Sequence, residues 1–222
     1  YLNASPEEEA AYQALLDVPF TYRGEHSATR NGQLVRIGLQ KAIFSSPAAA
    51  EVSVQQRIKK LESKPDISED EQQEIQALNS LLLALRNITP ASFHKYRDLL
   101  NLLGSKDYGW KKTDTEDRLV IFSERIETLN WLHSQLQGDL KLKDDAIRIL
   151  HGGMGDIEQQ EIVEEFGKPE SKLRVLLCSD VASEGINLHY LSHRLVHFDL
   201  PWSLMVFQQR NGRVDRYGQE QT

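Results

Sequence analysis

The chain contains 222 residues, of which 40% are hydrophobic and 27% charged, and its formal net charge is −7. These values are ordinary for a soluble protein of one or two domains, and the acidic balance argues against a basic nucleic-acid coat while leaving room for a local basic cleft. The single cysteine, Cys178, excludes an internal disulfide framework and favours a reduced, cytosolic setting, and no segment approaches the ~20 apolar residues of a membrane span.

The first hundred residues predict a series of amphipathic helices that begin with serine or threonine caps, often followed by proline. Ser5-Pro6, Ser46-Pro47 and Thr89-Pro90 are such starts, and Glu8 completes a capping box with Ser5. The predicted helices cover residues 6–16, 33–44, 48–63, a segment that begins after Ser68 and includes Leu85, and 91–103, with a connection at 20–32.

The predicted helix at 48–63 and the one after Ser68 are joined by a short turn at Lys64-Pro65-Asp66, so we expect them to form an antiparallel helical hairpin at about 47–88. A coiled-coil dimer is the alternative, although the apolar repeat is short. Residues 1–110 carry 12 basic and 14 acidic side chains, so we interpret the basic ones as solvated faces. Contact with a nucleic-acid backbone is the other interpretation.

From about Asp117 the pattern changes to short apolar strands separated by helical segments. Strands are predicted at residues 118–122, 146–150, 173–178 and 194–200, with a helix at 156–166 among the connections. Strands that alternate with helices indicate an α/β fold with a parallel sheet and right-handed crossovers. In such sheets, ligands bind beyond the carboxyl ends of the strands.

Small and polar residues follow the predicted strands at these ends. The Ser123 hydroxyl either caps the next helix or binds a backbone phosphate. Gly152 and Gly153 either let backbone amides approach a phosphate or form a tight turn. The pair Ser179-Asp180 follows the third strand. His151 has no partners at metal-ligand spacing, so no metal site is predicted.

Near the end of the chain, three arginines recur at every third position: Arg210, Arg213 and Arg216. At helical spacing, Arg213 and Arg216 lie on neighbouring positions of one face. Two rigid guanidinium forks held together suit a phosphate chain that develops negative charge. A solvated basic face is the alternative.

The order Gln-Arg-x-Gly-Arg-x-x-Arg-x-Gly-Gln at residues 209–219 resembles motif VI of superfamily two helicases and translocases, in its Swi/Snf-type version. The bacterial RapA/HepA-like branch is the best match. Residues 178–188 (CSDVASEGINL) resemble motif V, and residues 120–125 (VIFSER) resemble motif IV. The resemblance covers roughly residues 92–219.

This resemblance implies a fold and a set of site residues. It implies a helical extension at 1–104 and a second RecA-like lobe at 105–222, truncated at its C-terminus, within a larger protein. In the family, the arginines that match Arg213 and Arg216 act as arginine fingers on ATP bound mainly by another lobe. The other implied contacts are Gln209, Gly185 and Asn187 to the nucleotide, and Ser123, Gly152, Gly153, Ser179 and Asp180 to nucleic acid.

The sequence contains no Gly-x-x-x-x-Gly-Lys-Ser/Thr phosphate loop and no Asp-Glu-x-His-type metal motif. The resemblance therefore implies that ATP and Mg²⁺ are bound mainly by a first RecA-like lobe of the full-length chain. It also implies that residues 1–222 alone do not hydrolyse ATP. The implied nucleic-acid partner is double-stranded DNA.

Two other functions remain open at this stage. The first is an unwinding superfamily two helicase acting on DNA or RNA. The Gly-Gln ending counts against it, as does Glu184, which stands where many RNA helicases have arginine. The second is a non-catalytic binding module with the same fold, which we would expect to have lost Arg213 or Arg216.

Overall fold

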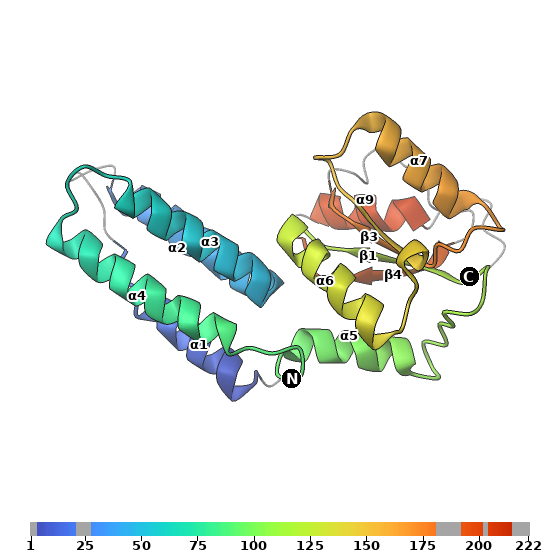
Figure 1. The fold of residues 1–222 in the computed structure, drawn as a ribbon, viewed down its shortest axis with the longest axis horizontal. Helices are drawn as coiled ribbons and strands as arrows, with labels where there is room; N and C mark the ends of the chain where they lie inside the picture. Colours follow the sequence, from blue (N-terminus) through green and yellow to red (C-terminus); the bar gives the residue numbers. More distant parts are fainter. Residues whose placement is uncertain (1–3, 21–27, 181–191, 202–203, 215–222) are drawn as a thin grey trace. The chain divides into compact units, whose positions relative to one another are not determined.

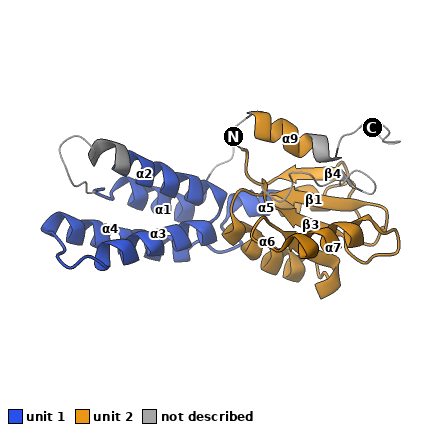
Figure 2. Ribbon diagram, turned by 90° about the horizontal axis from the view of Figure 1, so that it is seen from above, with its two compact units in different colours: residues 1–98 blue, residues 99–222 orange. Residues whose placement is uncertain are grey.

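The computed structural model describes residues 4–20, 28–180, 192–201 and 204–214 (Figure 1). The chain forms two compact units, residues 1–98 and 99–222 (Figure 2). The boundary falls inside helix α5 (His94–Gly104), whereas the predicted boundary at 104/105 coincides with the end of that helix. No described helix combines the length and the apolar character that a membrane-spanning segment needs.

The first unit contains four longer helices, α1 (Pro6–Leu16), α2 (Ala28–Ser45), α3 (Pro47–Glu62) and α4 (Glu69–Arg86). The caps predicted from the sequence are confirmed for α1, α3 and α4. The Ser5 hydroxyl accepts from the Glu8 backbone N–H at 3.1 Å, and the Ser5 N–H donates to the Glu8 carboxylate at 2.8 Å. Ser68 and Glu71 form the same reciprocal pair at the start of α4, whereas at α3 the Ser46 hydroxyl accepts from the Ala49 N–H alone.

In this unit α1 packs on α4, α4 on α3, and α3 on α2 (Figure 1). Ion pairs cross from α3 and the turn after it to α4, joining Arg57 to Glu74 and Lys64 to Glu71. Lys64 and Glu71 pair close to the turn, and Arg57 and Glu74 pair farther from it. The helices α3 and α4 therefore run antiparallel. The core between the helices is made of apolar side chains that include Leu15, Leu39, Val54, Leu61, Leu78, Leu81 and Leu85.

Helix α2 begins five residues earlier than the sequence predicted. Residues 28–32, expected to belong to a connection, are helical. A single glycine such as Gly32 lowers helix stability by only about 1 kcal/mol and does not end a helix. Burial of Leu39 and Ala42 in the core favours a long helix here.

The second unit contains a parallel sheet of four described strands: β1 (Arg118–Phe122), β2 (Ile147–Leu150), β3 (Val175–Cys178) and β4 (Ser192–His197). The spatial order is β2-β3-β1-β4, and every pair is parallel. The connecting elements include α6 (Ile126–Asp139), a short 3₁₀ turn η1 (Asp144–Ala146) and α7 (Asp156–Gly167), and α9 (Leu204–Val214) follows β4. The predicted fold class, a parallel α/β sheet after a helical extension, is confirmed.

The two central strands are buried along their whole length, as expected for a parallel sheet covered on both faces. Val120 and Phe122 of β1 are paired with Leu176 and Cys178 of β3, so these four side chains share one face. They pack against Phe166 of α7. This core fixes the strand register and therefore the positions of the strand ends, where the candidate site lies.

Candidate functional site

The carboxyl ends of the four strands lie along one edge of the sheet. Just beyond them, the backbone N–H of Ser123 donates to Cys178 O at 3.1 Å, and that of Ser179 donates to Leu150 O at 2.9 Å. Phe198 N–H donates to Phe122 O at 2.9 Å. The segments that follow the strands therefore begin side by side, as the parallel sheet predicted.

Ser123 and Asp199 form a buried polar pair at this edge. The Ser123 hydroxyl donates to Asp199 Oδ2 at 2.5 Å, and the Glu124 N–H donates to the same oxygen at 3.2 Å. Both side chains are buried. Asp199 thus ties the loop after β4 to the loop after β1. In this arrangement the Ser123 hydroxyl is bonded to a carboxylate of the protein itself, and its contact with a nucleic-acid phosphate stays a prediction.

Arg210 anchors α9 to the same edge. Its Nε donates to Asp180 Oδ1, and its Nη1 donates to the Asp199 carbonyl at 2.6 Å. The guanidinium lies over the Phe122 ring, 5.5 Å from the centroid. The side chain is fully buried, whereas that of Asp180 is 27% exposed. One guanidinium nitrogen, Nη2, has no hydrogen-bond acceptor among the described residues.

His197, the last residue of β4, contacts two consecutive residues of α9, Arg210 and Asn211. Its Nε2 is 2.8 Å from Asn211 Oδ1, and its Nδ1 is 3.4 Å from Arg210 Nη1. A neutral imidazole protonated on Nε2 satisfies both contacts, because it donates to the amide oxygen and accepts from the guanidinium. Burial lowers the pKa of His197, and the nearby Arg210 lowers it further, against an opposing effect of the hydrogen bond to Asn211.

Gly152 and Gly153 lie in an exposed turn directly after β2. The Gly153 N–H donates to His151 Nδ1 at 3.1 Å. A Cβ atom at Gly153 would stand 3.1 Å from that same nitrogen, so a larger residue would push the imidazole aside. The tight turn predicted as one alternative is present, and approach of a phosphate to these amides stays a prediction.

The remaining predicted residues divide into described and undescribed positions. Ser179 is buried at the end of β3, Gln209 is exposed on α9, and the backbone of Arg213 belongs to the last turn of α9. Gly185, Asn187 and Arg216 lie outside the described residues, as does the side chain of Arg213.

Sequence reasoning missed the structural role of Arg210 and of the two residues that hold it. Arg210 was recognised as part of the arginine repeat but was not assigned to the site. The sequence did contain a signal for such a partner. His197 and Asp199 interrupt an otherwise apolar strand segment, and polar groups buried in a sheet need hydrogen-bond partners.

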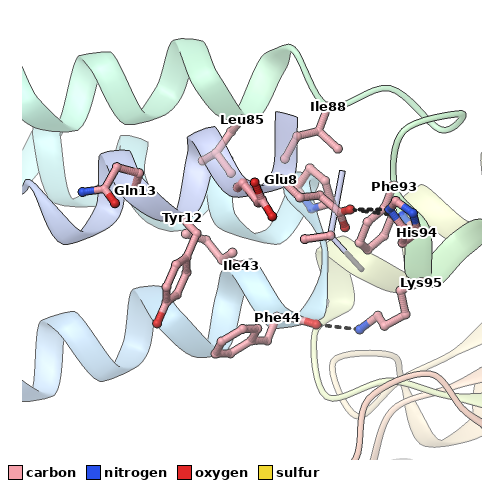
Figure 3. Close-up of a pocket in the computed structure, with 13 residues that line it drawn as sticks. Glu8, Tyr12, Gln13, Ile43, Phe44, Leu85, Ile88, Phe93, His94 and Lys95 are labelled. Atoms are coloured by element: carbon pink, nitrogen blue, oxygen red, sulfur yellow. Dashed lines mark hydrogen bonds and ion pairs between the residues drawn. The ribbon is translucent and has the colours of Figure 1, made fainter. Parts of the chain in front are cut away.

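A separate cavity of about 720 Å³ lies within the helical unit (Figure 3). The rings of Tyr12 and Phe44 lie beside each other in its lining, with centroids 6.1 Å apart. Its polar end holds an interaction between Glu8 Oε2 and His94 Nδ1 at 2.9 Å. The Lys95 ammonium donates to the Phe44 carbonyl at 2.6 Å. The cavity draws on separate helices, so no local motif revealed it, and none of the predicted site residues lines it.

A family model described as "Helicase conserved C-terminal domain" matches residues 94–218, more than half of the chain. The match includes the end of the helical unit and the whole described sheet.

Among curated proteins, RNA polymerase-associated protein RapA of Vibrio campbellii and of Vibrio cholerae are each 32% identical to the chain over 111 residues. The aligned region covers 49% of this chain and 11% of each relative. The chain therefore spans about a tenth of the length of the curated relatives it matches.

Two solved structures share the fold. The crystal structure of the C-terminal part of the Fun30 ATPase domain has a TM-score of 0.58 at 16% identity, covering 97% of this chain and 79% of that one. The helicase domain of Hef from Pyrococcus furiosus has a TM-score of 0.52 at 13% identity, covering 94% and 48%. At these identities the likeness shows the fold alone.

Proposed function

Because the chain belongs to the helicase conserved C-terminal domain family, we propose that it is the second motor lobe of an ATP-dependent nucleic-acid translocase. Its fold is RecA-like, and it belongs to superfamily two, on the RapA-like side of the Swi/Snf-type proteins. The whole protein would translocate along double-stranded DNA, with ATP at the cleft between this lobe and a first lobe of the same full-length chain.

The observation that carries the proposal is the position of α9. This helix contains Gln209 and Arg213, and Arg210 anchors it at the carboxyl edge of the sheet. That edge is where parallel α/β sheets bind ligands. A helix held there by a buried residue can present other side chains to a bound ligand without moving itself.

In the proposed reaction, Arg213 and Arg216 act as arginine fingers. Their guanidinium groups would neutralise the charge that develops on the phosphates during hydrolysis, an effect worth about 10³–10⁵ in rate for arginine fingers. Gln209, exposed on α9, would contact the nucleotide together with Gly185 and Asn187. ATP and Mg²⁺ would be bound mainly by the first lobe.

The described residues fit phosphate better than they fit a metal ion. No three histidine, cysteine, aspartate or glutamate side chains converge to form a metal site in the part of the chain that the structure describes. The edge instead offers the exposed turn after β2, where Gly152 and Gly153 carry no side chain that would keep a phosphate away from the backbone. We assign the exposed turn at Gly152 and Gly153, together with Ser123 and Ser179, to the nucleic-acid track.

The test is ATP hydrolysis by the full-length protein, with duplex DNA, single-stranded DNA or RNA added. We expect duplex DNA to stimulate hydrolysis most. Arg213→Ala and Arg216→Ala should each lower kcat by about 10³-fold or more. Arg148→Ala is the matched control, since Arg148 is an exposed arginine on β2 outside the site, and it should keep nearly full activity.

The other outcomes identify the competing functions. Stronger stimulation by single strands or RNA, together with strand separation, would indicate an unwinding helicase. No hydrolysis under any of these conditions would contradict a motor and favour a binding module. Hydrolysis that survives both arginine substitutions would contradict the assigned roles of these residues.

A further inference from the structure

The helical unit exposes large apolar side chains on two of its helices, α1 and α2. Among the described residues of this unit, six such side chains are exposed, and a single one of them, Leu83, lies on α4. The other five lie on α1 and α2: Tyr12, Leu16, Leu34, Ile37 and Phe44. Exposed apolar side chains that are scattered singly need no explanation, but their concentration on one pair of helices indicates an interaction surface.

Four of these side chains form one continuous face. The rings of Tyr12 and Phe44 lie 6.1 Å apart and join α1 to α2 beside the cavity (Figure 3). Leu16 follows Tyr12 by four residues and Ile37 precedes Phe44 by seven, so the helical period places each of them on the same side of its helix as the ring. We refer to Tyr12, Leu16, Ile37 and Phe44 as the α1/α2 face.

The two helices carry opposite charges. Helix α1 contains acidic residues and no basic ones, whereas α2 contains basic residues and no acidic ones. Because α1 begins at the cavity and α2 ends there, the two helices run in opposite directions. The exposed Glu9 lies three residues before Tyr12, and the exposed Arg36 lies eight residues before Phe44. The face is therefore acidic at the cavity end and basic at the other end.

The distances along the helices make this face complementary to itself. Measured from the level of the two rings, with a rise of about 1.5 Å per residue, Glu9 lies about 4.5 Å toward the cavity and Arg36 about 12 Å away from it. A twofold axis in the plane of the face, perpendicular to the helices and halfway between these two levels, turns a second copy end for end. Glu9 of each copy then lies at the level of Arg36 of the other, and Leu16 comes to within about 1.5 Å of the level of Tyr12.

We propose that the α1/α2 face is a dimer interface between two copies of this chain. A second copy supplies an apolar surface for the apolar surface and an opposite charge for each charge, whereas a phosphate backbone supplies neither an apolar surface nor a partner for Glu9. A face about 20 Å long and two helices wide covers roughly 400 Å² of each copy, which is small for a specific interface. The dimer is therefore weak and depends on concentration.

The first test is sedimentation equilibrium of the full-length protein without ATP or nucleic acid. We expect monomer at about 1 µM and an increasing fraction of dimer toward about 100 µM, because an interface of this size is weak. Monomer at every concentration would overturn the proposal. The proposal goes beyond the motor function and does not rest on it, so hydrolysis assays and sedimentation can fail independently of each other.

Charge reversal tests the facing pair. Glu9→Lys places a second cation opposite Arg36, and Arg36→Glu places a second anion opposite Glu9. Each variant alone should dimerise at least about tenfold more weakly than the wild type, because like charges face each other in both halves of the interface. In an equimolar mixture of the two variants every facing pair is opposite in charge again, so the heterodimer should regain the affinity of the wild type. Unweakened single variants, or a mixture that does not recover, would overturn the proposal.

The chain provides a matched control for Glu9→Lys. Glu7 and Glu9 both lie in the first turn of α1, where a carboxylate interacts favourably with the helix dipole, so reversal of either charge costs a similar amount of helix stability. Glu7 precedes Tyr12 by five residues and lies on a different side of the helix. Glu7→Lys should keep the dimer. Equal weakening by both reversals would place the effect in α1 itself and overturn the proposal.

A second pair of variants tests the apolar part of the interface. Phe44→Ala removes an exposed ring from the face, and Leu83→Ala removes an equally exposed side chain from α4. Aromatic side chains contribute most to interfaces, so Phe44→Ala should weaken the dimer at least about tenfold and Leu83→Ala should not. Circular dichroism checks that both variants keep their helices. Wild-type dimerisation of a folded Phe44→Ala variant would show that the interface lies elsewhere.

Discussion

At the scale of single residues, His197 has its protonation state fixed by two neighbours with opposite demands. Asn211 Oδ1 accepts a hydrogen bond from Nε2, and the Arg210 guanidinium needs a lone pair on Nδ1. A second proton on the ring would face a cation. Phe207 of α9 stacks on the imidazole with centroids 4.6 Å apart, so the ring has little freedom to turn away.

This environment predicts a pH dependence for the sheet unit. Burial holds the pKa of His197 below its ordinary 6.5, so the unfolded chain takes up a proton before the folded one does. Neutral His197 therefore stabilises the folded state fully above pH 6.5, and this contribution is lost as the pH falls through the lowered pKa of the folded state. Titration of the His197 ring by NMR checks the shift, and a midpoint at or above 6.5 would contradict it.

A substitution tests the consequence for stability. His197→Gln keeps a donor for Asn211 but cannot be protonated. The free energy of unfolding of this variant should depend less on pH below 6.5 than that of the wild type, by no more than one bound proton. Unfolding by denaturant at several pH values gives both slopes, and parallel slopes would show that His197 does not contribute.

Residue types and spacing predicted the strand ends, where the candidate site lies, but not how the side chains there are held. The strand ends were predictable because strand patterns and the rule for parallel sheets are local and general. The burial of Arg210 was not predictable in the same way, since its partners Asp180 and Asp199 are distant in sequence. An arginine in a repeat of three is normally taken as exposed, and only tertiary structure shows that this one is enclosed.

At the scale of elements, the antiparallel helices α3 and α4 are joined by ion pairs that differ in how deeply they are buried. Glu74 is fully buried and receives both Nε and Nη2 of Arg57, at 2.7 and 3.0 Å. Lys64, in the turn after α3, pairs with Glu71 in the first turn of α4. Arg86 and Glu51 meet at 3.3 Å near the other end, where the arginine is half-exposed.

The pair at the turn predicts a loss of stability in acid. The hydrogen bond from Lys64, followed by that from the Ser68 backbone, lowers the pKa of Glu71 from 4.5 to about 2. A carboxyl group with a depressed folded pKa stabilises the folded state fully above pH 4.5, and this contribution is lost as pH falls toward about 2. In the Glu71→Gln variant, the free energy of unfolding should therefore depend less on pH in this interval than in the wild type.

The matched control is Glu51→Gln, which removes the more exposed pair across the same two helices. Exposed pairs contribute about 0–1 kcal/mol, so this variant should change stability little at neutral pH. Helical circular dichroism during denaturant unfolding at pH 2.5–7 follows both variants. If Glu51→Gln cost as much stability at neutral pH as Glu71→Gln, the distinction between the two pairs would be wrong.

The ends of elements that depend on local chemistry were predictable to within a residue or two. The ends that depend on contacts distant in sequence were predicted less accurately. The starts of α1, α3 and α4 follow from hydroxyl caps. Helix α5 begins three residues later than expected because Thr89 and Ser92 bond to each other's backbone and form a turn. Strand β4 begins earlier than predicted because β1 pairs with it from Ser192 onward, which no local pattern reveals.

At the scale of the whole molecule, the proposed division of labour between two lobes predicts that residues 1–222 alone do not hydrolyse ATP. The chain contributes arginines but has no phosphate loop in its sequence. A hydrolysis assay on this chain with duplex DNA should give no signal above an Arg213→Ala/Arg216→Ala background. Addition of the separate first lobe should raise the rate, and any hydrolysis without that lobe would contradict the division.

The burial of Cys178 has a practical consequence for following the motion of the sheet unit. It is the single cysteine of the chain, it is fully buried in the strand next to Asp180, and burial raises the pKa of its thiol. Only the thiolate reacts readily with thiol reagents. In this chain, the rate at which a thiol reagent labels Cys178 under native conditions therefore reports how often the central strands separate. The protein therefore carries its own reporter of the opening of the sheet core, with no introduced probe.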